Sequence, residues 1–274
     1  MQSPHSSKMH LAQELVDHII DFLHDDPRTL LRVSLVSRVW VGRTRTYLYD
    51  SLKITRSKLF FLNFSCLTSI CGYVKILHFA WPKDATDPST IFDRFEQSKL
   101  HTLAIHFCEL RDLDRQIIQR SFAKFPCTSI TALELHDTSP TQGTFLTLLS
   151  LFPNVDDLMI SVNNRWKDES IPDPLENVGD DIIQPISPPR LRGSFKFSDP
   201  SGRGFRGSDH STQLLRTVAG LPPKFQTISL DINGLSQEVL PFLYSCSKTV
   251  RKIFVRLSFR KFRHCIPSTP VCSA

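Results

Sequence analysis

The sequence has no apolar run long enough to cross a membrane. The uncharged tract at residues 59–74 holds 16 residues and includes Asn63 and Gly72, whereas a spanning helix needs about 20 predominantly apolar residues. Residues 1–10 are polar and lack the apolar segment of a secretory leader. We therefore expect a protein of the cytoplasm or the nucleus, with no membrane partner.

The sequence also lacks the motifs that carry catalysis and cofactor binding. It contains no G-x-S-x-G, H-E-x-x-H or P-loop pattern. The seven cysteines are odd in number and follow no framework spacing, which favours reduced thiols. Cys66, Cys71 and His78 have no second pair at a ligand spacing, and neither has His264–Cys265, so no metal site is expected. We predict a protein that is not an enzyme and that binds no cofactor.

One glycine pattern matches a dinucleotide fingerprint but lacks its setting. Gly202, Gly204 and Gly207 fit G-x-G-x-x-G. Residues 199–201 separate them from the preceding candidate strand, and residues 208–211 separate them from the following candidate helix. A dinucleotide site needs the pyrophosphate directly on the helix N-terminus, so we interpret this segment as a loop.

Positive charge is concentrated in one short window. The chain has 33 Lys and Arg against 27 Asp and Glu, and residues 251–263 hold six of the bases and no acid. Ile253, Val255, Leu257 and Phe259 alternate with other residues there, which predicts a strand with one solvated face. A positive patch for an acidic substrate or for nucleic acid is the alternative. Nucleic acid is not the expected partner, because proteins that bind it usually spread their basic residues over a whole face or groove.

A repeated pattern of apolar residues runs through most of the chain. The order apolar-x-x-apolar-x-apolar occurs six times, and Cys108, Asn163 or Asn233 follows three of the copies. This is the strand half of a leucine-rich repeat, and segments with helical spacing lie between the copies. The copies are Val74, Leu77 and Phe79; Leu100, Leu103 and Ile105; Ile130, Leu133 and Leu135; Val155, Leu158 and Ile160; Phe225, Ile228 and Leu230; and Val250, Ile253 and Val255.

The repeats predict a leucine-rich-repeat-like α/β solenoid over residues 73–263, in which each strand–helix unit packs on the next. A longer interval between the fourth and fifth copies has room for a degenerate unit, with a strand at residues 192–197. Residues 163–210 are rich in proline and glycine, and we interpret them as an irregular excursion. Residues 264–274 fit no further repeat and are assigned to a tail.

Residues 9–50 predict a separate α-helical module. Apolar residues recur at helical spacing from Leu11 to Leu23 and again from Leu30 to Val39. Asp26–Pro27 between them is a helix start signal, because Asp caps free N–H groups and Pro suits the first turn. About 40 residues rarely hold a robust core alone, so we expect the module to complete itself against a partner. Residues 51–72 are predicted to be a connector.

This module resembles an F-box. Residues 11–40 contain the ordered string L-x-x-E-L-x-x-x-I-I-x-x-L followed by L-x-x-x-S-L-V-S-R-x-W. The chain departs from the family pattern at Ala12, where proline is usual, and at Ser37, where cysteine is common. The repeats that follow are similar to those of fungal F-box proteins with divergent leucine-rich repeats.

The resemblance implies the substrate-recognition subunit of a Skp–cullin–F-box ubiquitin ligase. In that family the helical module binds a Skp-type adaptor, which joins it to a cullin scaffold. The rest of the chain recruits a protein substrate, unknown here, for ubiquitin-dependent degradation. The residues that the resemblance places at the adaptor are Leu11, Glu14, Leu15, Ile19, Leu30, Leu31, Leu35 and Val36, with Trp40 holding the third helix.

A second interpretation of the module stays open. The end of a solenoid needs a cover, and three helices could cap it. The chain would then be a protein-interaction scaffold without a link to ubiquitin.

Overall fold

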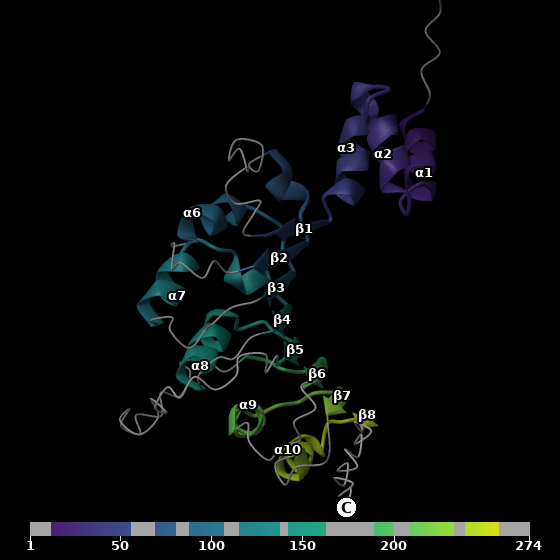
Figure 1. Ribbon diagram of the computed structural model, residues 1–274. Coiled ribbons are helices and arrows are strands. Elements are labelled where there is room, and N and C mark those ends of the chain that lie inside the picture. The colour runs from purple at the N-terminus through teal and green to yellow at the C-terminus, as the bar shows by residue number, and fades with distance from the viewer. Residues whose placement is uncertain are drawn as a thin grey trace, which may run out of the picture.

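The computed structural model contains an α-helical module followed by a curved α/β solenoid (Figure 1). It describes residues 12–55, 69–80, 88–106, 115–137, 142–162, 189–199, 209–232 and 239–257. Within these ranges, none of the helices combines the length and the apolar character that a membrane span requires.

Three helices form the module: α1 (Gln13–Phe22), α2 (Pro27–Ser34) and α3 (Arg38–Leu48). Asp26 caps α2, because its carboxylate accepts hydrogen bonds of 3.1 Å from the N–H groups of Arg28 and Thr29. Pro27 occupies the first turn, where no N–H is needed. The predicted helix start at Asp26–Pro27 is confirmed.

Eight parallel strands form one sheet in sequence order. They are β1 (Ser51–Ile54), β2 (Ile76–Ala80), β3 (Thr102–His106), β4 (Ala132–His136), β5 (Asp157–Ser161), β6 (Ser194–Ser198), β7 (Thr227–Ile232) and β8 (Lys252–Leu257). The register places equivalent repeat positions side by side, so that Leu77, Leu103, Leu133 and Leu158 form one row. An all-parallel sheet in chain order, with a crossover after each strand, is the architecture of a leucine-rich-repeat-like solenoid.

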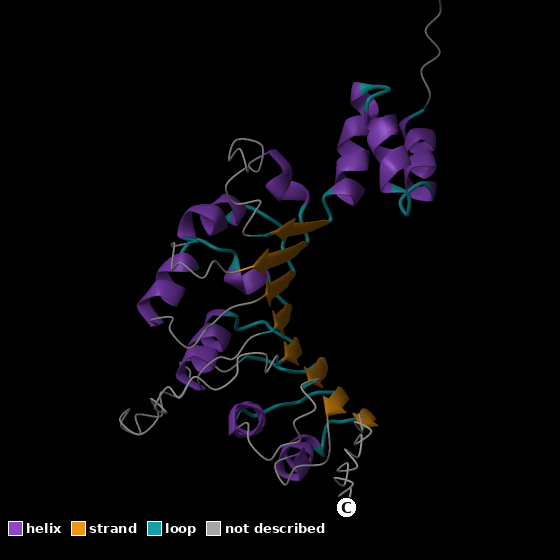
Figure 2. Cartoon of the chain, in the orientation of Figure 1, coloured by secondary structure: helices purple, strands orange, loops and turns teal. Residues whose placement is uncertain are grey.

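The crossovers carry helices that lie along one face of the sheet (Figure 2). They are α6 (Ser89–Phe92), α7 (Arg115–Ser121), α8 (Gln142–Leu151), α9 (Asp209–Gly220) and α10 (Val239–Cys246), with 3₁₀ turns η1 (Cys71–Tyr73), η2 (Asp93–Phe95) and η3 (Cys127–Ser129). The opposite face of the sheet, which we call the open face, has no described helix over it.

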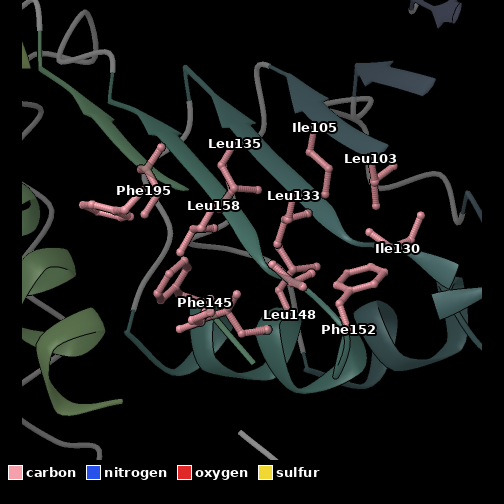
Figure 3. Close-up of a cluster of buried hydrophobic side chains, with 14 of the residues drawn as sticks. Leu103, Ile105, Ile130, Leu133, Leu135, Phe145, Leu148, Phe152, Leu158 and Phe195 are labelled. Carbon is pink, nitrogen blue, oxygen red and sulfur yellow. The ribbon is translucent and has the colours of Figure 1, made fainter. Parts of the chain in front are cut away.

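Alternate side chains of each strand enter the core between sheet and helices. Figure 3 shows Leu133 and Leu158 pointing toward Phe145, Leu148 and Phe152 of the α8 region. All five side chains are buried. This alternation explains the apolar-x-apolar half of the repeat, because successive strand residues face opposite sides of a sheet.

Phenylalanine links one coil of the solenoid to the next. The ring of Phe92 stacks on that of Phe122 at 4.6 Å, and Phe122 meets Phe152 edge to face at 5.4 Å. The rings of Phe195 and Phe242 pack at a tilt, with their centroids 4.8 Å apart. These rings fill the wide space behind the sheet without a polar group that needs a partner, which accounts for the 20 phenylalanines against four tyrosines.

The structure confirms the repeat positions of five of the six predicted copies, whose apolar residues are all buried. It also confirms the strand of the degenerate unit: β6 buries Phe195 and Phe197. The sixth copy differs, because Ile253 and Val255 in β8 are exposed. The predictions that concern Cys108, Asn163, Asn233, residues 202–207 and residues 258–274 lie outside the described residues.

The sheet begins earlier than the sequence predicted. β1 pairs in parallel with β2, and Ile54 is buried, so residues 51–54 belong to the solenoid and the prediction of a connector there was wrong. Ser51–Ile54 offers only two apolar positions, Leu52 and Ile54, which is too short a run to reveal a strand period.

Candidate functional site

The helical module leaves much apolar surface in water. Among the described residues, twelve large hydrophobic side chains are exposed, and six of them lie between residues 15 and 39, with exposed fractions from 48% to 86%. These six, here called the exposed apolar set, are Leu15, Phe22, Leu31, Leu35, Val36 and Val39. Concentrated exposed apolar side chains mark interaction sites, so this set is the candidate functional site.

All three helices contribute to the exposed apolar set. Leu15 and Phe22 are seven residues apart on α1, two turns of helix, and therefore lie on one side of it. Leu31 belongs to α2, and Leu35 and Val36 follow at the turn into α3. The set is therefore presented by helices and by the short turn between two of them, which keeps its side chains in defined places.

A small core lies under this surface. Val16, Ile20 and Leu30 are buried, and Trp40 and Tyr47 pack against them. This cluster is distinct from the single large cluster of the solenoid. The module thus has a core of its own, and its exposed apolar set is not used to bury the end of the solenoid.

A hydrogen-bonded pair ties α1 to α3. The Asp21 carboxylate accepts bonds of 2.8 Å from Nε and from one terminal nitrogen of Arg43, and a third of 2.8 Å from the Tyr47 hydroxyl. The Tyr47 hydroxyl and then the Arg43 guanidinium lower the pKa of Asp21. The same bond to Asp21 raises the pKa of Tyr47. These contacts set the angle at which α1 presents Leu15 and Phe22.

The structure divides the residues that the F-box resemblance placed at an adaptor. Glu14, Leu15, Leu31, Leu35 and Val36 are exposed, and Ile19 is half-buried. Trp40 packs against the module core from α3, and Leu11 lies outside the described residues.

Leu30 needs a correction. Its side chain is 1% exposed and lies in the module core beside Val16 and Ile20. A partner could reach it only by opening the module. We therefore assign Leu30 to the support of the site, whereas its neighbour Leu31, which the resemblance also placed at the adaptor, faces solvent.

Sequence reasoning missed two members of the exposed apolar set. Phe22 is 86% exposed, and Val39 is exposed in the first turn of α3. The seven-residue spacing from Leu15 was the available signal for Phe22, since side chains two turns apart share one side of a helix. Val39 belongs to the helical apolar pattern of residues 30–39, but that pattern does not separate its buried members from its exposed ones.

The open face of the sheet carries a second group of chemically active side chains. We call this group the histidine cluster. It consists of His78 from β2, His106 from β3, and Glu134 and His136 from β4. His78 Nδ1 lies 3.1 Å from His106 Nε2, and the rings of His106 and His136 stack at 4.5 Å. His136 Nε2 lies 2.9 Å from Glu134 Oε2. Ala104 lies between His78 and Glu134 in the register of the sheet and is fully buried.

Two members of the histidine cluster, His78 and His106, resist protonation. Burial, helped by the charges of His136 and His78, lowers the pKa of His106 to about 4. Burial also lowers the pKa of His78. The bond from His136 lowers the pKa of Glu134, which favours its carboxylate. At neutral pH His78 and His106 are therefore uncharged, and Glu134 is a carboxylate.

The described thiols and carboxylates offer no evident reactive centre. Burial raises the pKa of Cys71 to about 11 and that of Cys127 to about 12, which disfavours the nucleophilic thiolate. Within the described ranges, no group of three or more His, Cys, Asp or Glu side chains is placed to hold a metal ion.

Comparisons with known proteins add little to this geometry. No protein-family model matches the chain, and no curated protein matches it. Among solved structures, the leucine-rich repeat-containing protein LegL7 from Legionella pneumophila is similar to it with a TM-score of 0.47 and 16% identity, over 80% of this chain and 79% of that one. The likeness is distant, and the in-register parallel sheet of this chain is itself the evidence for its repeat fold.

Proposed function

We propose that this chain is the substrate-recognition subunit of a Skp–cullin–F-box ubiquitin ligase. The module of α1–α3 binds a Skp-type adaptor, and the solenoid recruits a protein target for ubiquitin-dependent degradation. The chain itself carries out no catalysis, holds no cofactor, and acts in the cytoplasm or the nucleus. A leucine-rich-repeat-like solenoid is a protein-interaction scaffold, which suits the recruiting half of this role.

One observation carries the adaptor half of the proposal. Four residues that the F-box string places at the adaptor, Leu15, Leu31, Leu35 and Val36, have exposed fractions of 49%, 56%, 82% and 71%. Keeping such side chains in water is unfavourable by roughly 25 cal/mol for each Å² of apolar surface. A partner that covers them would recover that free energy. A module of about 40 residues buries little surface by itself, so it also gains stability from such a partner.

The interpretation of the module as a solenoid cap fits this observation less well. A cap would bury its apolar side chains against the first coil of the solenoid. Leu35 and Val36 instead stay largely in solvent, and the module core is separate from the solenoid core.

The test is direct binding to a purified Skp-type adaptor, measured by titration calorimetry with the full chain. The double variant Leu15→Asp with Leu35→Asp places charge in the exposed apolar set and should abolish binding. The matched control, Leu240→Asp with Tyr244→Asp, makes the same change at apolar side chains of α10 that are 65% and 82% exposed, and it should bind like the wild type. Circular dichroism establishes that all three proteins are folded.

Failure of the folded wild type to bind the adaptor would remove the ligase role and leave an interaction scaffold. Equal loss of binding in both double variants would show that added charge, and not the exposed apolar set, is responsible.

A further inference from the structure

The last strand of the sheet, β8, is built like a core strand but is left uncovered. All six of its residues are exposed, although it pairs along its whole length with β7. Within the described part of the chain, β8 is the end of the sheet and has a strand neighbour on one side. Figure 2 shows it beyond β7, and none of the strands that the structure describes lies on its outer side.

The core-facing side chains of β8 are apolar, and they remain exposed. Ile253, Val255 and Leu257 lie in register with Ile228, Leu230 and Ile232 of β7. The three residues of β7 are buried, whereas those of β8 are 51%, 44% and 36% exposed. The row therefore continues the solenoid core up to its last strand and stops with apolar side chains in water.

The backbone of β8 offers hydrogen bonds on its free side. The N–H of Lys252 donates to the Gln226 carbonyl on the β7 side, at 3.1 Å. Because successive N–H groups of a strand point in opposite directions, those of Ile253 and Val255 point away from β7. Such a strand edge is a ready template for another strand.

The charge on β8 selects the kind of strand that can pair there. Lys252 and Arg256 alternate with the apolar row on the open-face side, and Arg251 precedes them. Asp231 lies beside Arg256 in the register and offsets part of this charge, while Lys252 lies beside Thr227. Residues 251–257 contain no acid. A second copy of β8 would bring like charges together, which is unfavourable across paired strands.

We propose that β8 is a docking edge for an extended acidic segment of another protein, which adds to the sheet as a further strand. Alternate apolar side chains of that segment cover Ile253, Val255 and Leu257. The acidic side chains between them face Lys252 and Arg256, next to the exposed ring of Phe254. In strand addition the main chain supplies affinity and the alternate side chains supply specificity. This site is independent of the adaptor role of the helical module.

Peptide binding to the full-length chain tests the proposal. The probe is a fluorescein-labelled peptide of about six residues, the usual strand length, in which Glu and Val alternate. A block peptide of the same composition, with its Glu residues first and its Val residues last, keeps the charge and loses the alternation. Fluorescence anisotropy should show the alternating peptide binding about tenfold more tightly, because only it satisfies both rows at once.

A charge reversal on β8 gives the sharper measurement. Lys252→Glu with Arg256→Glu should lose the Glu–Val peptide and gain a Lys–Val peptide of the same pattern. Lys99→Glu with Arg120→Glu is the matched control: it makes the same charge change at exposed residues elsewhere, and should keep the preference of the wild type. Hydrogen exchange should slow at the amides of Ile253 and Val255 when the Glu–Val peptide is added.

Several results would overturn the proposal. Equal binding of the block peptide, or equally tight binding of a short DNA duplex, would reduce β8 to a general polyanion patch. Dimerisation seen by sedimentation that excludes the peptide would assign the edge to a second copy. Absence of peptide binding by a chain that circular dichroism shows to be folded would mean that the edge is already occupied or unused.

Discussion

Asp21 on α1 and Arg43 on α3 form a two-pronged contact, in which the guanidinium donates two hydrogen bonds of 2.8 Å to the two carboxylate oxygens. The residues are 22 positions apart, and both are partly exposed. Planar pairing of this kind fixes orientation as well as distance. In this molecule it fixes the helix that presents Leu15 and Phe22 relative to the helix that completes the module.

Loss of this contact should loosen α1 before it changes the rest of the chain. Asp21→Asn removes the charge and keeps the shape, so amide exchange along α1 should become severalfold faster while exchange in the solenoid strands stays the same. Adaptor affinity should fall in parallel. Asp17→Asn is the control, because Asp17 makes its hydrogen bond to Gln13 within α1. Unchanged exchange in Asp21→Asn would show that the small core alone fixes α1.

Two neighbouring leucines should behave in opposite ways. Leu30 is 1% exposed and Leu31 is 56% exposed. Leu30→Ala leaves a cavity in the module core and should lower its free energy of unfolding by about 2–5 kcal/mol. Leu31→Ala should change it by less than about 0.5 kcal/mol, as surface substitutions usually do, yet weaken adaptor binding.

Urea titration of each variant followed by adaptor calorimetry separates the two effects. If Leu31→Ala binds the adaptor as tightly as the wild type while Leu15→Asp with Leu35→Asp does not, Leu31 lies outside the interface. If Leu30→Ala leaves stability unchanged, the module core is not organised around this side chain.

The repeat positions were predictable because they obey a strict geometric rule. Leu77, Leu103, Leu133 and Leu158 occupy one row of a parallel sheet, and a one-residue slip would move each of them to the open face. A constraint that recurs in every coil leaves a periodic trace in the sequence. β1 escaped prediction because a four-residue strand with two apolar positions leaves almost no trace.

The candidate site was only partly predictable, for a different reason. Leu30 and Leu31 are identical in type and adjacent, and both fall within the apolar pattern of α2. Which of them points inward depends on how α2 packs against the other two helices, and Leu30 is the one that enters the core with Val16 and Ile20. The histidine cluster escaped for the same reason, since His78, His106 and His136 meet only through the pairing of β2, β3 and β4.

Gly193 should be intolerant of any side chain. A Cβ atom at this position would collide with Oδ1 of Asp157 and lie 3.2 Å from the Asp156 carbonyl oxygen. Asp157 cannot move aside freely, because that oxygen accepts hydrogen bonds from the N–H and the hydroxyl of Ser194. Gly193→Ala should therefore lower the free energy of unfolding by about 1–3 kcal/mol, as overpacking does.

Gly220 supplies the control for Gly193. A Cβ atom there would meet nothing within 4 Å, and the residue ends α9. Gly220→Ala should leave stability unchanged or raise it by up to about 1 kcal/mol, since alanine is the better helix former. Urea denaturation gives the free energy of unfolding of both variants. If Gly193→Ala is as stable as Gly220→Ala, the β5–β6 junction adapts to the added methyl group.

The histidine cluster should make the solenoid sensitive to mild acid. The pKa of His106 is about 4 in the folded chain against an ordinary value of 6.5, so below pH 6.5 the unfolded chain binds more protons than the folded one. The stability linked to His106 is therefore fully present above pH 6.5 and is lost as the pH falls toward 4. The lowered pKa of His78 acts in the same direction, and that of Glu134 adds a further loss below its ordinary value of 4.5.

The surroundings of the cluster support the same sign. Lys53 on β1 lowers the pKa values of His78 and His106, and Asp137 after β4 partly opposes this at His106. One pKa unit corresponds to about 1.4 kcal/mol, and solvent screens part of it at a half-buried site. We therefore expect the free energy of unfolding in urea to fall by about 1–2 kcal/mol between pH 7 and pH 4.5 on account of the cluster.

His106→Gln keeps a polar side chain that does not titrate, so it should flatten this dependence. His101→Gln, an exposed histidine just before the same strand, should keep it. An equal loss of stability in His106→Gln and the wild type would place the acid sensitivity elsewhere in the chain.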